Sequence, residues 1–252
     1  MKRCLWLVGS MLVFAPLWAE DDNGQFPQGP NHLEPIAPYD HFGDDYYQIV
    51  FRALIGRGNF DCWMICRPSF QPEYAVALKE EVSKIVNANP KDPFTARIEY
   101  DVVLEVAVAT KQIWHYEQPE GGKLQLDLLK NVKIDRKKIG VTKDFRDAIT
   151  EAWRAVLRLT RYAEEDSTGL DGTVYDFFCT GNFFGTTWTP EVTKAPLPSE
   201  LVKLAKELRA IVESAPEKRQ ALQDEALKHA AKMKAAAEEE YKKLKRPAAP
   251  AK

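Results

Sequence analysis

Residues 171–190 read DGTVYDFFCTGNFFGTTWTP, with two runs rich in aromatic and β-branched residues on either side of Gly181-Asn182. Such runs favour strands, and a Gly-Asn pair between them is typical of the tight turn of a β-hairpin. Pro190 ends the second run because proline has no N–H to donate to a sheet. The stretch therefore predicts a hairpin, and with it an antiparallel sheet.

Earlier segments are expected to supply more strands of the same sheet. YYQIVFRALI (46–55) and FDCWMICRPSF (60–70) flank the turn residues GRGN, which predicts a first hairpin that Pro68 closes. RIEYDVVLEVAVATKQIWHYE (97–117) predicts one long strand or two adjoining ones. After the turn residues EGGK, KLQLDLLKNVKI (123–134) predicts another strand.

One segment between these strands is ambiguous. In PEYAVALKEEVSKIVNA (72–88), Pro72 with Glu73 and the later spacing of Val and Lys slightly favour a helix. The alternation of Tyr74 and Val76 instead fits a strand. We therefore expect a helix here, with a strand as the alternative.

Two segments predict amphipathic helices that cover the sheet. Residues 143–164 follow Thr142, a preferred N-cap, and their large apolar residues recur at the spacing of one helical face. That face consists of Phe145, Ile149, Trp153, Val156 and Leu157. Ser199 is expected to cap a second helix over 199–214, which Pro216 interrupts. Its apolar stripe consists of Leu201, Leu204, Leu208 and Ile211.

The C-terminal part differs in composition from the rest. Residues 216–252 are rich in Ala, Glu and Lys and carry few large apolar side chains, so they predict an exposed charged helix ending in the disordered tail RPAAPAK. A coiled coil is the alternative, although no regular heptad of large residues persists. The whole chain is expected to be α+β: an antiparallel sheet built from hairpins, covered by two amphipathic helices, with a projecting C-terminal helix.

The N-terminal residues carry the features of an export signal. Lys2 and Arg3 precede an apolar run that is too short to span a membrane comfortably, and Ala19 is a small residue at a plausible cleavage site. We expect residues 1–19 to be a signal peptide, with an uncleaved N-terminal anchor as the alternative. No later segment is apolar enough to be an integral membrane span. The mature protein is therefore expected to be periplasmic or secreted.

The mature chain divides by composition into three parts. Residues 20–44 contain four prolines and predict an extended Pro-rich arm. Residues 45–215 predict a single α+β domain, and residues 216–252 the exposed helix and tail. The net charge is −2, and residues 216–252 hold ten Lys or Arg against six Asp or Glu. An acidic body with a basic tail argues against nucleic acid as a partner.

Three cysteines remain after residue 19: Cys62, Cys66 and Cys179. On one strand, Cys62 and Cys66 would lie about 13 Å apart, too far for a disulfide with each other. Because an oxidising compartment favours disulfides, we expect Cys179 to bond to Cys66, or to Cys62 in its place. The remaining thiol is expected to be buried, with redox chemistry or intermolecular pairing as the alternative.

The spacing of the cysteines argues against other chemistry. Thioredoxin-like sites use C-x-x-C at the start of a helix, whereas here three residues intervene and the flanks favour strands. A zinc site would need about four ligands, and only Cys179 and scattered histidines could complete one. We therefore predict no metal site and no cofactor.

No enzyme signature is evident. The sequence has no G-x-S-x-G and no phosphate-binding loop, and His115 is the only histidine within the predicted domain body. Asp44-Asp45, or Asp171 with Asp176, could form a carboxylate pair, although Asp171 is more typical of a turn. No catalytic residue is predicted. The alternative is a periplasmic enzyme, either a hydrolase using His115 with carboxylates or a thiol-dependent oxidoreductase.

The aromatic residues of the 171–190 hairpin suggest a contact surface. Both of its faces are apolar, and one of them must meet a second layer of the fold or a partner, because large exposed apolar patches are uncommon in solitary soluble proteins. Tyr175, Phe184 and Trp188 are the candidate partner-binding residues. We therefore expect a non-catalytic envelope protein that binds a protein or peptide partner through this hairpin or through the C-terminal helix.

Overall fold

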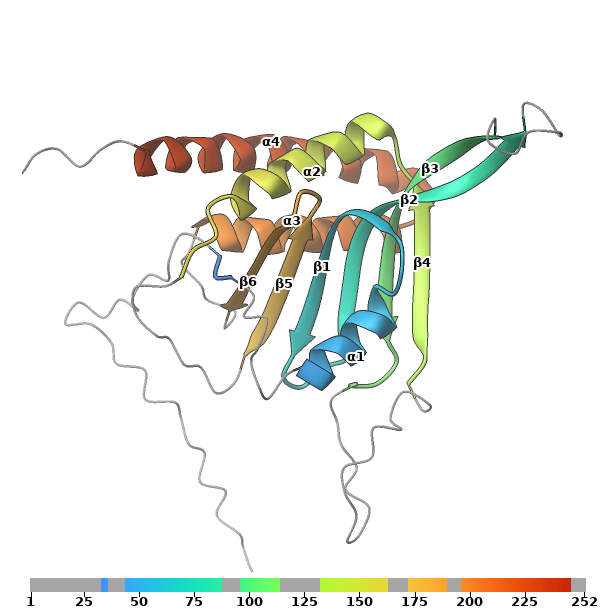
Figure 1. Cartoon of the computed structure of the whole chain (residues 1–252), viewed down its shortest axis with the longest axis horizontal. Helices are drawn as coiled ribbons and strands as arrows, with labels where there is room; N and C mark the ends of the chain where they lie inside the picture. Colours follow the sequence, from blue (N-terminus) through green and yellow to red (C-terminus); the bar gives the residue numbers. More distant parts are fainter. Residues whose placement is uncertain are drawn as a thin grey trace, which may run out of the picture.

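The computed structural model describes residues 33–35, 44–87, 96–113, 132–162, 172–189 and 196–245. Within these residues, six strands form one antiparallel sheet in the order β4-β3-β2-β1-β5-β6 (Figure 1). The strands are β1 (Asn59–Pro68), β2 (Tyr74–Asn87), β3 (Ala96–Ala109), β4 (Ile134–Gly140), β5 (Thr173–Cys179) and β6 (Phe183–Thr189). The helices are α1 (Asp44–Leu54), α2 (Lys143–Leu157), α3 (Pro196–Glu213) and α4 (Pro216–Leu244). The predicted α+β class is confirmed.

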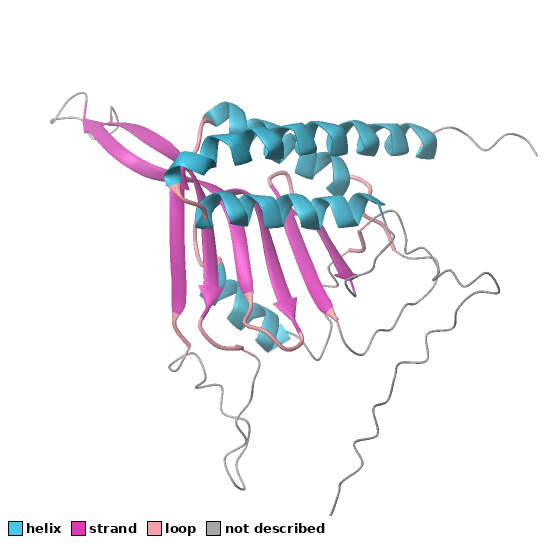
Figure 2. Ribbon diagram, turned by 180° about the vertical axis from the view of Figure 1, so that it is seen from behind, coloured by secondary structure: helices cyan, strands magenta, loops and turns pink. Residues whose placement is uncertain are grey.

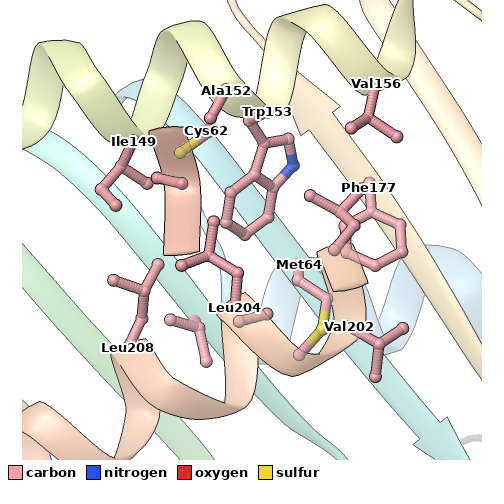
Figure 3. Packing of buried hydrophobic residues seen from close by; sticks show 14 of the residues in the cluster. Cys62, Met64, Ile149, Ala152, Trp153, Val156, Phe177, Val202, Leu204 and Leu208 are labelled. Atoms are coloured by element: carbon pink, nitrogen blue, oxygen red, sulfur yellow. The ribbon is translucent and has the colours of Figure 1, made fainter. Parts of the chain in front are cut away.

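The helices form layers on the two faces of the sheet. Helices α2, α3 and α4 lie on one face and α1 lies on the other (Figures 1 and 2). The larger core lies between the sheet and the helices α2 and α3, as the apolar stripes of these helices predict. Trp153 projects from α2 toward Leu204 of α3 and Phe177 of β5 (Figure 3). The rings of Trp153 and Phe177 pack edge to face, with their centres 5.7 Å apart.

The hairpin at 171–190 is present as β5 and β6. Its turn is possible because Gly181 and Asn182 take positive φ angles of 95° and 63°, which few other residues adopt. Thr142 caps α2 as predicted, its side chain accepting a hydrogen bond from the Phe145 N–H at 3.1 Å.

The first predicted hairpin is wrong in its first half. Residues 46–55 were expected to be a strand, but most of them belong to α1. The neighbouring β1 is already paired on both sides, by β2 and β5, and leaves no edge for a third strand. As a helix, the segment places Val50 and Leu54, four residues apart, together against the second apolar core. This core lies on the face of the sheet opposite to α2 and α3, which we call the open face.

The helix favoured over residues 72–88 is also wrong, because this segment is β2. Tyr74, Val76 and Leu78 contact the core under the helices, while Ala75 and Ala77 contact the core under α1. Burial on both faces produces a continuous apolar run, and such a run does not distinguish a strand from a helix.

Three boundaries differ from the sequence predictions. Helix α3 begins at Pro196, so Ser199 lies inside the helix and is not its cap. Helix α2 ends at Leu157, earlier than the predicted 164. Strand β4 begins at Ile134, and residues 123–131 of the predicted strand lie outside the described residues.

The predicted C-terminal helix is present as α4 and runs along α2 and α3. Most of its surface is exposed, and its one buried stripe is made mainly of small residues. That stripe consists of Ala226, Ala230, Met233 and Ala237. No helix within the described ranges is long and apolar enough to cross a membrane.

A short piece of the predicted arm lies against the edge of the sheet. The backbones of Glu34 and Thr186 exchange two hydrogen bonds, of 2.9 and 2.7 Å, and Leu33 is fully buried. Gly185 makes room for this anchor, since a Cβ there would lie 2.9 Å from the Cβ of Leu33. The predicted signal peptide and the other arm residues before α1 lie outside the described residues.

Candidate partner-binding surface

The three aromatic residues predicted to bind a partner do not share a surface. Tyr175 is buried on the face of the sheet that α2 and α3 cover, with the Lys206 ammonium 5.8 Å from its ring centre. Phe184 is 43% exposed and belongs to the opposite face, since residues alternate along a strand. Trp188 is half-buried against Gly172, where a Cβ would lie 2.0 Å from the indole nitrogen. Phe184 and Trp188 are four residues apart on β6 and therefore share a face, whereas Tyr175 lies on the other. The structure thus brings together two of the three predicted residues, and partner binding through them stays a prediction.

Phe184 continues a row of aromatic rings across the open face. Successive ring centres along the row are 5.0 to 6.3 Å apart. The row consists of Tyr47, Phe51, Trp63, Phe178 and Phe184. Contacts of this kind add to the burial of apolar area, so the row attaches α1 to β1 and β5.

A buried polar cluster lies beside this row. Arg67 Nε donates to Asp176 Oδ2 at 2.7 Å, and Thr186 Oγ1 donates to the other carboxylate oxygen at 2.9 Å. The guanidinium carbon of Arg67 lies 5.9 Å from the ring centre of Tyr46 and 5.6 Å from that of Tyr47. The pKa of both phenols is raised, mainly by burial. Asp176 is 1% exposed, so this carboxylate is part of the core and does not act in an accessible carboxylate pair.

Glu73 extends the cluster, and sequence reasoning missed it. Its side chain is fully buried and accepts hydrogen bonds from Tyr46 Oη and from the Ile113 N–H, both at 2.7 Å. A buried carboxylate with two such donors is a satisfied structural group. It connects α1 to β2 and to the end of β3. No sequence signal distinguished it from the surface acids around it.

The three thiols are free and buried in the structure. Cys62 lies opposite Cys179 across β1 and β5, whereas Cys66 lies opposite Tyr175. The predicted Cys66–Cys179 bond does not fit this register, because the two residues are four positions out of line. Burial raises the pKa of all three thiols, that of Cys66 to about 11.

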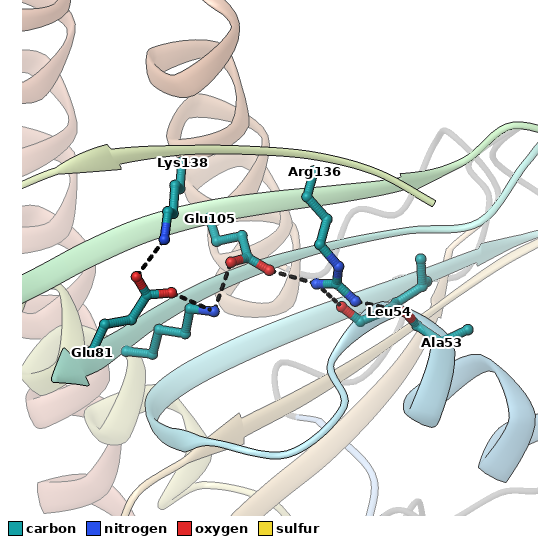
Figure 4. Close-up of polar contacts among 7 residues, drawn as sticks. Ala53, Leu54, Glu81, Glu105, Arg136 and Lys138 are labelled. Atoms are coloured by element: carbon teal, nitrogen blue, oxygen red, sulfur yellow. Dashed lines mark hydrogen bonds and ion pairs between the residues drawn. The ribbon is translucent and has the colours of Figure 1, made fainter. Parts of the chain in front are cut away.

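The outer strand β4 carries a charged network on the α1 side (Figure 4). Lys138 pairs with Glu81, and Lys79 lies between Glu81 and Glu105. Arg136 pairs with Glu105 and donates to the carbonyl oxygens of Ala53 and Leu54 at the C-terminal end of α1. The network therefore holds α1 in place and covers the β4 edge with charge, which discourages pairing with another strand.

Strands β2 and β3 extend beyond their neighbours as a two-stranded ribbon (Figures 1 and 2). Strand β1 pairs with β2 only as far as Glu80, and β4 pairs with β3 only from Val103. Beyond these points β2 and β3 pair with each other as far as Asn87 and Ala96. We call residues 81–87 and 96–102 the ribbon.

One face of the ribbon is apolar and exposed. Val82 lies opposite Tyr100, and Ile85 lies opposite Ile98. Because directly opposed residues share a face, and residues two apart on one strand do too, all four side chains lie on the same side. Their exposed fractions range from 44% to 60%. We call these four side chains the apolar face of the ribbon.

The edges of the ribbon differ from the other edges of the sheet. The β6 edge is covered in part by Glu34, and the β4 edge carries charge. Among the described residues, no strand pairs with the outer edge of either ribbon strand, although the Val141 N–H donates to the Val102 carbonyl at 3.0 Å. An edge of this kind is a template for an additional strand.

A cavity of about 460 Å³ lies at the base of the ribbon, where β4 ends. Apolar side chains of β3 and β4 line it together with the charged groups of Asp101 and Lys138. Val82 of the apolar face also lines it, so the cavity and that face adjoin.

Comparison of the sequence with protein-family models and with curated proteins, and of the fold with solved structures, found no significant match. The described residues also contain no group of three or more His, Cys, Asp or Glu side chains placed to hold a metal ion. His115 and Asp171, which the hydrolase alternative would use, lie outside the described residues.

Proposed function

We propose that this chain is an exported, non-catalytic binding protein of the bacterial envelope that holds an extended segment of a partner protein against the ribbon. The observation that supports this most is the apolar face of the ribbon. Four large exposed apolar side chains gather there, while most apolar side chains of the sheet are buried. Gathered apolar exposure of this kind marks interaction sites in soluble proteins.

The chemistry of the ribbon favours a β-strand as the occupant. Its outer edges offer rows of backbone donors and acceptors, which an extended segment satisfies and a helix does not. A segment added beside residues 96–101 of β3 would lie in line with β4, whose pairing with β3 stops at Val103. Alternate side chains of that segment would contact the apolar face, and one of them would reach the cavity.

The export part of the proposal rests on the sequence. Residues 1–19 have the composition of a signal peptide, which puts the partner among periplasmic or secreted proteins and peptides. The acidic body makes nucleic acid a poor candidate.

Two other interpretations receive less support. A thiol-dependent oxidoreductase needs an accessible thiol with a lowered pKa, whereas all three thiols are buried and their pKa values are raised. Binding through the C-terminal helix would use its charged surface, because its apolar stripe already contacts the core.

The test uses the mature chain and a phage-displayed library of random peptides about twelve residues long, enough for one added strand. We expect the selected peptides to alternate apolar and polar residues. Their affinity should fall at least about tenfold for Ile85→Glu/Ile98→Glu, because these two residues make up half of the apolar face. The control is Phe70→Glu/Tyr162→Glu, which alters two exposed aromatic residues outside the ribbon.

Hydrogen exchange then identifies the bound backbone. A selected peptide should slow the exchange of amides at the outer edge of residues 96–101. If no peptide is enriched, or if the enriched peptides bind the ribbon variant and the wild type equally, the proposal is wrong.

A further inference from the structure

Cys62 and Cys179 form a directly opposed pair across β1 and β5. The Thr180 N–H donates to the Asp61 carbonyl at 2.8 Å, which is one of the two backbone bonds that define a hydrogen-bonded pair. Such pairs alternate along antiparallel strands, which makes the next pair, Cys62 and Cys179, a non-hydrogen-bonded one. In that position the two side chains approach each other most closely.

The geometry of such a pair suits a covalent bond. The Cα atoms of a non-hydrogen-bonded pair are about 4.5 Å apart, within the range of about 4.4 to 6.8 Å that disulfides require. Cys66 cannot compete for Cys179, because four residues of strand would place it about 13 Å farther along.

Both thiols point into the same part of the core, beneath α2. Cys179 Sγ lies 3.6 Å from the Thr150 carbonyl oxygen, and the two cysteines are 0% and 1% exposed. The nearby Cys179 thiol adds to the effect of burial in raising the pKa of Cys62. An oxidant has no access to either sulfur once the sheet is formed.

We propose that Cys62 and Cys179 are the site of a cross-strand disulfide, formed while the chain folds in an oxidising compartment. One cysteine thiolate attacks a small or protein disulfide and releases one thiol from it, giving a mixed disulfide. The other cysteine then attacks the mixed disulfide and releases the second thiol. The two cysteines lose two electrons and two protons, and the oxidant disulfide gains both. Cys66 remains a thiol.

The experiment refolds the unfolded, reduced mature chain in a buffer of oxidised and reduced glutathione. The product is denatured without reductant, alkylated and weighed. We expect one alkylated thiol per chain out of the three present, and a peptide map that joins the segment of Cys62 to that of Cys179. Three alkylated thiols, or a map that joins Cys66 to either partner, would overturn the proposal.

Variants separate the three cysteines. Cys66→Ser should still form the bond and leave no thiol to alkylate, whereas Cys62→Ser and Cys179→Ser should leave both remaining thiols reactive. Because a buried serine could prevent folding, the wild-type peptide map decides the pairing independently of the variants. The result is also independent of peptide binding at the ribbon, so either proposal can fail without the other.

Discussion

Arg67 and Asp176 form an ion pair across β1 and β5 with a nitrogen–oxygen distance of 2.7 Å, and the Asp176 side chain is 1% exposed. Arg67→Ala would leave this carboxylate buried without its cation. We expect a loss of about 3–5 kcal/mol in the free energy of unfolding, measured with urea. Lys228→Ala, which breaks an exposed pair with Glu225, is the control and should leave the unfolding midpoint unchanged. Equal midpoints for the two variants would contradict the buried pair.

Gly185→Ala should loosen the anchored piece of the arm. The new Cβ would lie 2.9 Å from Leu33 and 3.0 Å from Leu157, so Leu33 must move. Overpacking of this kind costs about 1–3 kcal/mol of stability. Hydrogen exchange should show faster exchange of the Glu34 and Thr186 amides. Gly140→Ala is the matched control, since nothing lies within 4 Å of its added Cβ, and it should leave both amides as protected as before.

Ala230→Leu and Ala231→Leu test how α4 lies on the core. Ala230 is 1% exposed in the buried stripe, and its neighbour Ala231 is exposed. Leucine at 230 must force α4 away from the core, at a cost of about 1–3 kcal/mol in the free energy of unfolding. Leucine at 231 should change it little. If thermal unfolding shows the same midpoint for both variants, α4 does not lie on the core in this orientation.

Stability should fall above pH 9. Burial raises the pKa of Cys66 from 9.0 to about 11. The unfolded chain therefore releases this proton at lower pH than the folded chain, and the stability contributed by the thiol is complete below pH 9 and lost between pH 9 and 11. The difference of two units corresponds to about 3 kcal/mol.

Urea unfolding at pH 8 and pH 10.5, with a reductant present, measures this effect. Tyr74, whose pKa is also raised mainly by burial, shifts stability in the same direction. The wild type should lose about 2 kcal/mol more than Cys66→Ala over this interval. Parallel losses in the two proteins would mean that the Cys66 thiol is not buried as described.

The parts of the fold that depend on local sequence were predictable. The turn at Gly181-Asn182 needs two positive φ angles, and few other residue pairs supply them. Thr142 caps α2 because its side chain satisfies the Phe145 N–H, which has no partner within the helix. These signals act within a few residues, so they can be recognised in one sequence.

The errors concern segments whose neighbours decide their structure. Residues 46–55 are rich in aromatic and β-branched residues, yet they form α1, and β1, with which they were expected to pair, is already paired on both sides. Tertiary contacts override propensity in such cases. Val50 and Leu54 have the four-residue spacing of a helix, and that spacing was the available signal.

The candidate site could not be predicted for a related reason. Ile98 and Tyr100 alternate like any residues on one face of a strand, and nothing in their own sequence shows that β4 stops pairing before reaching them. Likewise, the choice between Cys62 and Cys66 depends on the register of β1 with β5, which a single sequence does not specify.

The place of β1 in the sheet has a consequence for the order of folding. Strands β1 to β4 are neighbours in chain order, whereas β1 must also pair with β5, more than a hundred residues later. Such distant pairing is slow, because the entropy cost of closing a long loop comes before any stabilising contact forms. Until β5 arrives, the long edge of β1 is open to wrong partners. The pairing of β1 with β5 therefore completes the sheet in its interior. A chaperone that acts on this protein would have to protect the exposed edge of β1 until then.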